Sequence, residues 1–229
     1  MIPVEEIRRA REVLEGVAIR TPLVRLDVED GPEIWLKLEL LQPVRSFKIR
    51  GAGNAVLQAR ADEIAGGVFT ASAGNMAQGL AYAARLRGVP ATIVAPEHAP
   101  QAKVTAIERY GGRVIKVPYD EWWDVLVTGE SEHTSGLYIS PVDNDRVMAG
   151  NGTIGLELLD GAFAVPLEEA ADAVRLLAER TRVIAEGAGA LSTAVARSGR
   201  IDARKIVCVV SGGNIDPAVL ARILLGETP

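Results

Sequence analysis

Two patterns of hydrophobic and polar positions follow one another along the chain. Short apolar runs predict buried strands, and longer segments with apolar residues at every third or fourth position predict amphipathic helices. The expected strands cover residues 34–38, 68–71, 91–95, 113–117, 137–139 and 206–210. The expected helices cover residues 4–14, 49–61, 76–86, 101–110, 153–159, 167–180, 188–196 and 217–225. Strands that alternate with helices indicate an α/β protein with a parallel sheet covered on both faces.

The segment 119–136 interrupts this alternation. It is the least regular part of the chain and the richest in acidic and polar residues. Trp122 and Trp123 lie within it. We interpret the two tryptophans as packing anchors in preference to a binding platform.

The composition of the chain limits the class of protein. The 229 residues are 48% hydrophobic and 24% charged, which suits one large or two small globular domains. The net charge is −5, with no basic stripe on a predicted helix, so nucleic acid and anionic membranes are not expected partners. No apolar segment approaches the ~20 residues of a membrane-spanning helix, and residues 1–15 predict a charged amphipathic helix instead of a signal peptide. We therefore expect a cytoplasmic protein.

Few side chains are suited to metal or thiol chemistry. The single cysteine, Cys208, lies in the apolar run 206–210 and predicts a buried structural thiol with no disulfide inside the chain. His98 and His133 are the two histidines, and neither has a partner at metal-ligand spacing. We therefore expect no metal site and no Ser-His-Asp triad.

Lys48 is the strongest single candidate for chemistry. The chain has five lysines against twenty arginines, and Lys48 lies where a helix is expected to begin, after the strand 34–38. An amine, unlike a guanidinium, can lose its proton and attack a carbonyl, and the positive end of the helix dipole favours the neutral amine. Lys48 is thus a candidate Schiff-base lysine. The alternative is a solvated lysine in the first turn of a surface helix.

The glycine-containing loop 72–79 directly follows the expected strand 68–71. Its small residues allow the backbone to approach a ligand, and Asn75 can donate and accept hydrogen bonds. The alternative is a helix cap formed by Ser72 or Asn75. The two interpretations are compatible, because the N-terminus of a helix is also an anion site.

Two further loops are rich in glycine. Residues 150–155 have the spacing G-x-G-x-x-G, but no strand precedes them, so we expect a turn that opens a helix, with Thr153 near a ligand, instead of a dinucleotide site. Residues 211–214 directly follow the strand 206–210. Ser211 there either bonds a cofactor or belongs to a strand-to-helix turn that Asp216 or Asn214 caps.

Taken together, these loops resemble those of the fold-type II pyridoxal-phosphate enzymes, and within them the threonine dehydratase and serine racemase group. The matching blocks are Ser46-Phe47-Lys48-Ile49-Arg50-Gly51-Ala52, Ser72-Ala73-Gly74-Asn75-Met76-Ala77-Gln78-Gly79, Gly150-Asn151-Gly152-Thr153 and Ser211-Gly212-Gly213-Asn214. Weaker matches lie at 20–23, 102–106 and 186–190. The resemblance implies the tryptophan synthase β-like α/β fold, with two domains of parallel-type sheets flanked by helices. The small domain would be 51–140, and the large cofactor domain 1–50 plus 141–229.

The resemblance also implies roles for individual residues. Lys48 would form the Schiff base with pyridoxal 5'-phosphate and move the α-proton, and Phe47 would pack on the cofactor. Asn75 would bond the 3-hydroxyl of the cofactor, and Ser211, with Gly212 beside it, would bond the ring nitrogen. The substrate carboxylate would be held by the backbone of Ser72, Ala73, Gly74, Asn75 and Met76.

Two positions help to choose the reaction. Ser211, in place of a carboxylate, would leave the ring nitrogen largely unprotonated, which suits loss of a β-hydroxyl better than transamination. Racemases of this group carry a second serine, as a base on the opposite face, where this chain has Ala73. We therefore expect β-elimination by Lys48. L-serine or L-threonine would lose water and then ammonia to give a 2-oxo acid, the reaction of a threonine/serine ammonia-lyase.

The sequence departs from the family pattern in two places. Met76 occupies the usual position of a histidine. In addition, Leu158-Leu159 runs directly into Asp160-Gly161, where the family carries a long segment with a glycine-rich phosphate loop and, in several members, a divalent-metal site. More than one βαβ unit, each of about 30 residues or more, is missing, so the large domain is expected to be truncated.

Three explanations of the missing segment stay open. The chain is a deletion that has lost tight cofactor binding, or it binds the phosphate through residues 187–189 or 150–153, or the sequence omits a segment of the protein. The alternative to an enzyme is a catalytically impaired variant or pseudoenzyme that acts as a scaffold or subunit partner. Because missing strands would leave sheet edges uncovered, we expect a homo-oligomer, in the simplest case a dimer.

Overall fold

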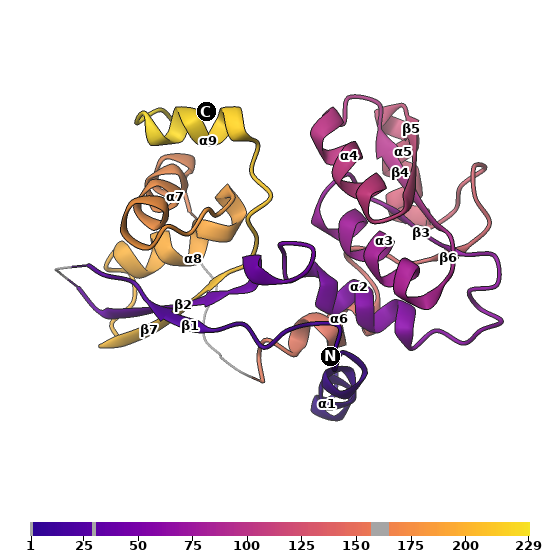
Figure 1. The fold of residues 1–229 in the computed structure, drawn as a ribbon, viewed down its shortest axis with the longest axis horizontal. Helices are drawn as coiled ribbons and strands as arrows, with labels where there is room; N and C mark the ends of the chain where they lie inside the picture. The colour runs from indigo at the N-terminus through magenta and orange to yellow at the C-terminus, as the bar shows by residue number, and fades with distance from the viewer. Residues whose placement is uncertain (1, 29–30, 157–164) are drawn as a thin grey trace. The chain divides into compact units, whose positions relative to one another are not determined.

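The structure is a computed structural model that describes residues 2–28, 31–156 and 165–229 (Figure 1). The chain divides into two compact units. Residues Met1–Ile19 and Lys48–Glu157 form one unit, which we call the lysine unit. Residues Arg20–Phe47 and Leu158–Pro229 form the other, which we call the serine unit.

The lysine unit contains a parallel sheet with the strand order β5-β4-β3-β6. Its strands are β3 (Val68–Ala71), β4 (Ala91–Pro96), β5 (Gly112–Val117) and β6 (Leu137–Tyr138). Its helices are α1 (Val4–Val13), α2 (Lys48–Leu57), α3 (Asn75–Arg87), α4 (Gln101–Arg109), α5 (Tyr119–Thr128) and α6 (Asp145–Gly152). Neighbouring residues of β4 pack into different clusters, Ile93 with Leu80 of α3 and Val94 with Val125 of α5. Both faces of this sheet are therefore covered, as the sequence predicts.

Helices α1 and α6 pack against α2 and belong to the lysine unit. A Cβ atom at Gly150 of α6 would overlap the carbonyl oxygen of Arg50, and one at Gly51 would lie 2.6 Å from Asn151 Oδ1. Small residues thus allow α2 and α6 to approach closely. The unit therefore contains the predicted small domain, 51–140, together with two helices that the sequence prediction placed in the large domain.

The predicted helix 153–159 is wrong in its described part. Helix α6 begins earlier, because the Asn144 side chain caps it and accepts a hydrogen bond from the Val147 N–H group at 3.0 Å. The helix ends at Gly152, and residues 153–156 form a turn. Residues 157–159 of the prediction lie outside the described residues.

The segment expected to be irregular contains helix α5, which starts after Pro118 and ends at Gly129, where φ is +72°. Trp122 is partly buried and packs against the cluster that contains Val125. Trp123 is 49% exposed. The interpretation as packing anchors is therefore confirmed for Trp122 and wrong for Trp123.

The serine unit contains a smaller, mixed sheet with the strand order β1-β2-β7. Strand β1 (Leu23–Arg25) runs antiparallel to β2 (Glu33–Leu38), which runs parallel to β7 (Lys205–Val210). A short 3-10 helix, Glu39–Leu41, follows β2, and the helices are α7 (Leu167–Thr181), α8 (Gly187–Arg197) and α9 (Pro217–Leu224). The pattern did not predict β1 or the 3-10 helix, whose three-residue lengths are too short to show a period.

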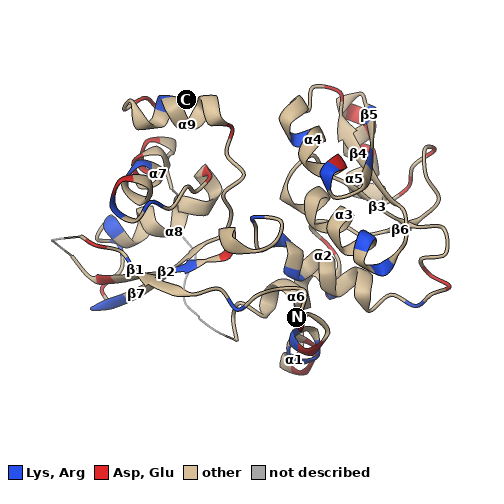
Figure 2. Ribbon diagram, viewed as in Figure 1, with Lys and Arg blue, Asp and Glu red and all other residues tan. Residues whose placement is uncertain are grey.

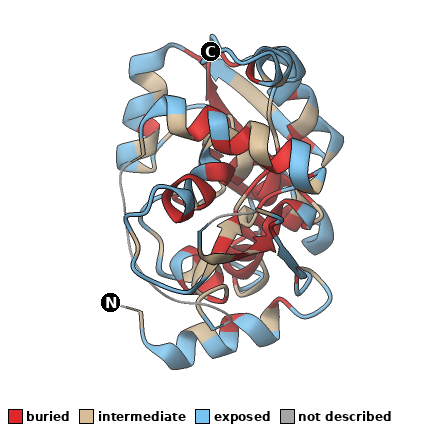
Figure 3. Ribbon diagram, turned by 90° about the vertical axis from the view of Figure 1, so that its left-hand side faces the viewer, coloured by how far each residue is buried: buried red, intermediate tan, exposed pale blue. Residues whose placement is uncertain are grey.

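The core of the serine unit joins the sheet to α7 and α8. Leu36 of β2 and Cys208 of β7 pack with Leu177 of α7 and Ala190 of α8. Cys208 is buried, as predicted, and burial raises the pKa of its thiol to about 11. Figure 3 shows buried residues on the strands and on parts of the helices, and Figure 2 shows charged residues on helices, strands and loops alike. Among the described residues, no helix is both long and apolar enough to cross a membrane.

Candidate functional site

Lys48 is the first residue of α2, as predicted. Its side chain is half-buried, and this burial lowers the pKa of the Nζ amine from its ordinary value. The positive end of the helix dipole also favours the neutral form. The structure thus gives Lys48 what a nucleophilic or basic lysine needs, an amine that loses its proton more readily than a solvated one.

Helix α3 lies beside Lys48 in the same unit. A Cβ atom at Gly79 would lie 3.1 Å from the Lys48 carbonyl oxygen. No side chain caps α3, whose N-cap residue is Gly74. The Ser72 hydroxyl accepts a hydrogen bond from the Gly74 N–H group at 3.2 Å, within the loop. The alternative, a cap by Ser72 or Asn75, is therefore wrong. The backbone N–H groups at the start of α3 are of the kind that binds an anion.

Two neighbours of Asn75 have side chains in apolar surroundings. Met76 is buried in the core of the lysine unit. Only its backbone can therefore contribute to a ligand site. The Ala73 side chain packs against a cluster that contains Ala95 and Val104. Position 73 thus offers a methyl group and no titratable group.

In the serine unit, Ser211 lies at the carboxyl end of β7. Its carbonyl oxygen accepts a hydrogen bond from the Phe47 N–H group at 3.0 Å, and Ser46 forms an antiparallel bridge with Gly212. Lys48 follows Phe47 directly in the chain. These contacts therefore hold the residue that precedes the lysine against the loop that contains Ser211.

Further bonds connect the same two loops. The Asn214 side chain donates from Nδ2 to the Val44 carbonyl oxygen at 3.1 Å, and the Gly213 N–H group donates to the Arg45 carbonyl oxygen at 3.1 Å. Arg45 has a φ of +57°, a left-handed conformation that is uncommon for a residue with a side chain. The sequence suggested Asn214 only as a possible helix cap, since nothing local shows that its partner lies 170 positions away.

A buried polar network lies under the loop before Lys48. Glu39 is fully buried and accepts hydrogen bonds from the Thr21 hydroxyl at 2.7 Å and from Gln42 Nε2 at 3.0 Å. The Lys37 amine donates to the Thr21 carbonyl oxygen at 2.6 Å. Sequence reasoning missed this network, although polar residues within the apolar run that ends at Leu41 were a signal for it. The network fixes the start of the loop that leads to Phe47.

The two loops suggested for phosphate differ in the structure. Gly150 and Gly152 belong to the last turn of α6, where the helix dipole disfavours an anion. The Thr153 hydroxyl is buried, donates to the Gly150 carbonyl oxygen at 2.7 Å and accepts from Arg50 Nη1 at 3.1 Å. Residues 150–153 therefore do not fit a phosphate, and the expectation that they open a helix is wrong.

Residues 187–189 instead begin α8, and no side chain caps this helix. A Cβ atom at Gly189 would overlap the Gly212 carbonyl oxygen, while one at Gly187 would meet no atom within 4 Å. The Glu186 N–H group donates to the same Gly212 oxygen at 3.1 Å. The N-terminus of α8 thus lies beside the Ser211 loop, and its backbone N–H groups fit an anion such as a phosphate.

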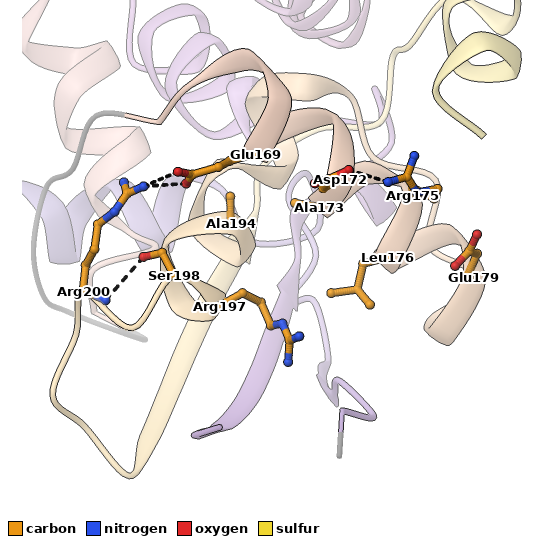
Figure 4. Close-up of a pocket in the computed structure, with 10 residues that line it drawn as sticks. All are labelled: Glu169, Asp172, Ala173, Arg175, Leu176, Glu179, Ala194, Arg197, Ser198 and Arg200. Carbon is orange, nitrogen blue, oxygen red and sulfur yellow. Dashed lines mark hydrogen bonds and ion pairs between the residues drawn. The ribbon is translucent and has the colours of Figure 1, made fainter. Parts of the chain in front are cut away.

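A groove of about 520 Å³ lies between α7 and the C-terminal half of α8 (Figure 4). Its charged side chains pair with one another, Arg200 with Glu169 at 2.5 Å and Arg175 with Asp172. Helix α8 is roughly 15 Å long, so the groove is remote from the helix end that contacts Gly212. It does not belong to the candidate site. Among the described residues, no group of three or more His, Cys, Asp or Glu side chains could hold a metal ion.

Comparison with known proteins places this geometry in a family. Residues 14–162 match the family model described as "Pyridoxal-phosphate dependent enzyme". The L-threonine ammonia-lyase of Thermotoga maritima is 31% identical over 315 residues, which cover 98% of this chain and 78% of that protein. The serine racemase of Oryza sativa subsp. indica is 36% identical over 167 residues, which cover 69% of this chain and 48% of that protein.

Solved structures show the same likeness. A serine racemase from Dictyostelium discoideum superimposes with a TM-score of 0.84 at 25% identity, covering 94% of this chain and 99% of that one. The processed form of threonine deaminase isoform 2 from Solanum lycopersicum superimposes with a TM-score of 0.82 at 25% identity, covering 98% of this chain and 89% of that one. The predicted fold class, pyridoxal-phosphate fold type II, is therefore confirmed.

The comparison also bears on the missing segment. The alignment with the Thermotoga maritima protein extends over 315 residues, 86 more than the 229 of this chain. That relative therefore carries residues that this chain lacks. The predicted junction, at 159–160, lies outside the described residues. The match of the family model and the likeness over nearly the whole chain show that the protein belongs to the pyridoxal-phosphate dependent enzymes, whose cofactor is pyridoxal phosphate.

Proposed function

We propose that the chain catalyses the β-elimination of L-threonine or L-serine. The substrate loses water across its Cα–Cβ bond, and the released enamine takes up water and loses ammonia to give a 2-oxo acid. The chemistry that bound pyridoxal phosphate supplies is withdrawal of electrons from the substrate Cα, which makes the α-proton acidic. The observation that carries the proposal is the placement of Lys48, half-buried at the start of α2 and next to the uncapped helix α3.

Lys48 is the proposed catalytic residue. Burial lowers the pKa of its amine, so Nζ is neutral more often than that of a solvated lysine and can accept the α-proton. The N-terminus of α3 favours negative charge, and its amides, from Ser72 to Met76, are proposed to hold the substrate carboxylate.

The remaining proposed roles orient the cofactor. Asn75 would bond the 3-hydroxyl, and the Phe47 ring would pack on the pyridine face. The Ser211 hydroxyl would bond the ring nitrogen, with Gly212 beside it. A hydroxyl donates a hydrogen bond but does not give up its proton near neutral pH, so electron withdrawal by the ring would stay moderate. This favours loss of the β-hydroxyl over transamination.

The phosphate would lie at the N-terminus of α8. Residues 187–189 offer uncapped backbone N–H groups next to Gly212, and a dianion is stabilised at a helix N-terminus. This site replaces the glycine-rich loop that the sequence lacks. Gly187 and Gly189 are the proposed phosphate-binding glycines.

Elimination is preferred to racemisation because of position 73. Inversion at Cα needs a second acid or base on the face opposite Lys48. The Ala73 methyl group packs against apolar neighbours and can supply neither. The relatives include proteins named as ammonia-lyases and as racemases, so the reaction itself has to be measured.

The test begins with a titration of the purified chain with pyridoxal phosphate, followed by visible absorbance. We expect a Schiff-base band that saturates, is lost in Lys48→Ala and persists in Lys103→Ala, which removes an exposed lysine of α4. Incubation with L-serine or L-threonine in deuterated water should then release 2-oxo acid and ammonia. Formation of the D-amino acid at a comparable rate would contradict the proposed reaction.

A second candidate function is a scaffold or subunit partner without activity. The 86-residue excess in the alignment favours it, because the relative carries backbone that this chain lacks. Absence of the band, or the same band in Lys48→Ala, would support this second function. A homodimer in the cytoplasm remains part of both proposals, and sedimentation velocity would measure the dimer.

A further inference from the structure

Helix α5 carries an apolar stripe that faces solvent. Tyr119, Trp123 and Val127 are spaced four residues apart and so lie on one side of the helix. They are 49%, 49% and 68% exposed. The rings of Tyr119 and Trp123 stack with their centroids 6.5 Å apart. The opposite side of the helix packs Val125 into the core, so α5 is apolar on two sides and buried on one.

The stripe continues into a neighbouring hollow. A cavity of about 450 Å³ is lined by Trp123, Val127 and Val142 among others, and Val142 is 71% exposed. We call these residues, with Tyr119, the α5 face. Single exposed apolar residues are ordinary on a protein surface, but an aligned set beside a hollow is typical of a binding surface. Tryptophan and tyrosine are also the residues most enriched where protein partners bind tightly.

The segment of the chain that contains the α5 face is strongly acidic. The segment 117–145 contains no lysine and no arginine. It holds seven carboxylates, Asp120, Glu121, Asp124, Glu130, Glu132, Asp143 and Asp145. Its formal charge of −7 exceeds the −5 of the whole chain, so the rest of the protein is slightly basic. The one histidine of the segment, His133, pairs with Glu121 at 2.7 Å.

We propose that the α5 face docks a basic amphipathic helix of another protein. An exposed apolar stripe along a helix is matched by a second helix with apolar residues at spacings of three and four. The carboxylates around the stripe select lysine and arginine on the flanks of that helix. The rings of Tyr119 and Trp123 add a surface that attracts such cations.

Charge decides against a second copy of the chain as the occupant. A twofold contact places the same surface on both partners. Two α5 faces would then bring together two segments that each carry a formal charge of −7, and like charges that face each other oppose association. A basic partner neutralises these charges instead. The docking surface belongs to the lysine unit alone and does not depend on the proposed enzyme reaction.

The test uses a synthetic helical peptide of about 18 residues, or five turns, with leucine at every third or fourth position and lysine or arginine elsewhere. A second peptide has the same composition in an order that breaks the apolar stripe. Calorimetric titration of the full chain should show micromolar binding of the first peptide and at least tenfold weaker binding of the second. Binding should also weaken as salt is raised.

Matched variants locate the binding. Trp123→Ala should weaken the binding of the first peptide at least tenfold. Leu86→Ala, which shortens a 48% exposed side chain of α3, should leave that binding unchanged. Asp124→Lys should strongly weaken the binding of the first peptide. Glu108→Lys makes the same change of charge on α4 and should have little effect on this binding. Unchanged thermal unfolding would show that each variant is folded. Equal binding of both peptides, no binding, an unaffected Trp123→Ala, or self-association that Trp123→Ala abolishes would each overturn the proposal.

Discussion

The two units differ in how fully their strands are covered. In the lysine unit, β3 and β4 have neighbours on both sides, and apolar clusters lie on both faces of the sheet. In the serine unit, the described residues form three strands, and β7 pairs with β2 alone. Ile206, Val207 and Val209 of β7 remain half-buried, whereas strands of parallel sheets are usually buried on both faces.

The difference matters because the proposed cofactor residues come from both units. Lys48 and Asn75 belong to the unit with the more complete sheet, while Ser211 and the start of α8 belong to the other. The proposed residues of the serine unit are therefore supported by a sheet that is less fully covered than the sheet of the lysine unit. We infer that the serine unit limits both stability and cofactor affinity.

The largest expected effect comes from adding one methyl group in each unit. Gly150→Ala would force a Cβ atom into the Arg50 carbonyl oxygen in the lysine unit, and Gly189→Ala would force one into the Gly212 carbonyl oxygen in the serine unit. Each should cost about 3 kcal/mol of unfolding free energy. Gly187→Ala is the control, because its Cβ would meet no atom within 4 Å.

Amide hydrogen exchange would compare the two units directly. Gly189→Ala should speed exchange in β2, β7 and α7 more than in β3 and β4, and Gly150→Ala should do the reverse. Gly187→Ala should leave the pattern of exchange unchanged. If Gly150→Ala or Gly189→Ala speeds exchange equally in both units, the units unfold together. The difference between their sheets would then not reflect a difference in stability.

The next effect concerns the buried network of the serine unit. Glu39→Ala would remove the buried carboxylate that accepts hydrogen bonds from the Thr21 hydroxyl and from Gln42 Nε2, which should cost about 2–3 kcal/mol. Glu33→Ala removes a part-exposed carboxylate from the start of the same strand and should cost less than ~1 kcal/mol. Urea unfolding measures both. A Glu39→Ala chain as stable as Glu33→Ala would show that the network does not support the unit.

Regular elements and the lysine could be predicted from the sequence because their signals are local. The run 206–210 is apolar throughout, so β7 and its buried Cys208 follow from composition alone. The position of Lys48 at the start of a helix could be predicted because the spacing of apolar residues changes after β2 from a strand pattern to a helix pattern. The predicted ends of α3 and α4 lie within one residue of the observed ends, because Gly88 and Gly111 follow the helices with positive φ.

Tertiary packing decided what the sequence did not show. Gly150 looked like a loop residue, yet it lies inside α6, because only glycine lets this helix approach Arg50 so closely. The bond from Asn214 to Val44 and the burial of Glu39 depend on residues distant in the sequence. The helix or strand propensity of single residues gives no information about such distant partners.

A smaller effect would sharpen the role of the serine unit in positioning. Asn214→Ala removes the bond to the Val44 carbonyl oxygen, worth about 1 kcal/mol, so cofactor affinity should fall about fivefold. Because the bond orients the loop before Lys48, the turnover number should fall more than substrate affinity. Asn144→Ala removes a helix cap of the lysine unit and is the control of similar stability cost. If Asn214→Ala and Asn144→Ala lower the cofactor affinity equally, Asn214 contributes to stability and not to the positioning of the loop.

The smallest effect tests the lysine unit through pH. Burial lowers the pKa of Lys48 below the 10.5 of an ordinary lysine, so the folded chain loses this proton at a lower pH than the unfolded chain. Between the two pKa values the unfolded state binds more protons, and stability rises with pH in that window. Below the window the charged amine costs stability, which Lys48→Met would relieve. The unfolding midpoint of Lys48→Met should therefore exceed that of the natural chain at pH 7, and the gap should narrow as pH approaches 10.5. If the difference between the two unfolding midpoints does not change with pH, the change of side chain and not the loss of charge sets it. The amine of Lys48 would then lose its proton no more readily than that of a solvated lysine.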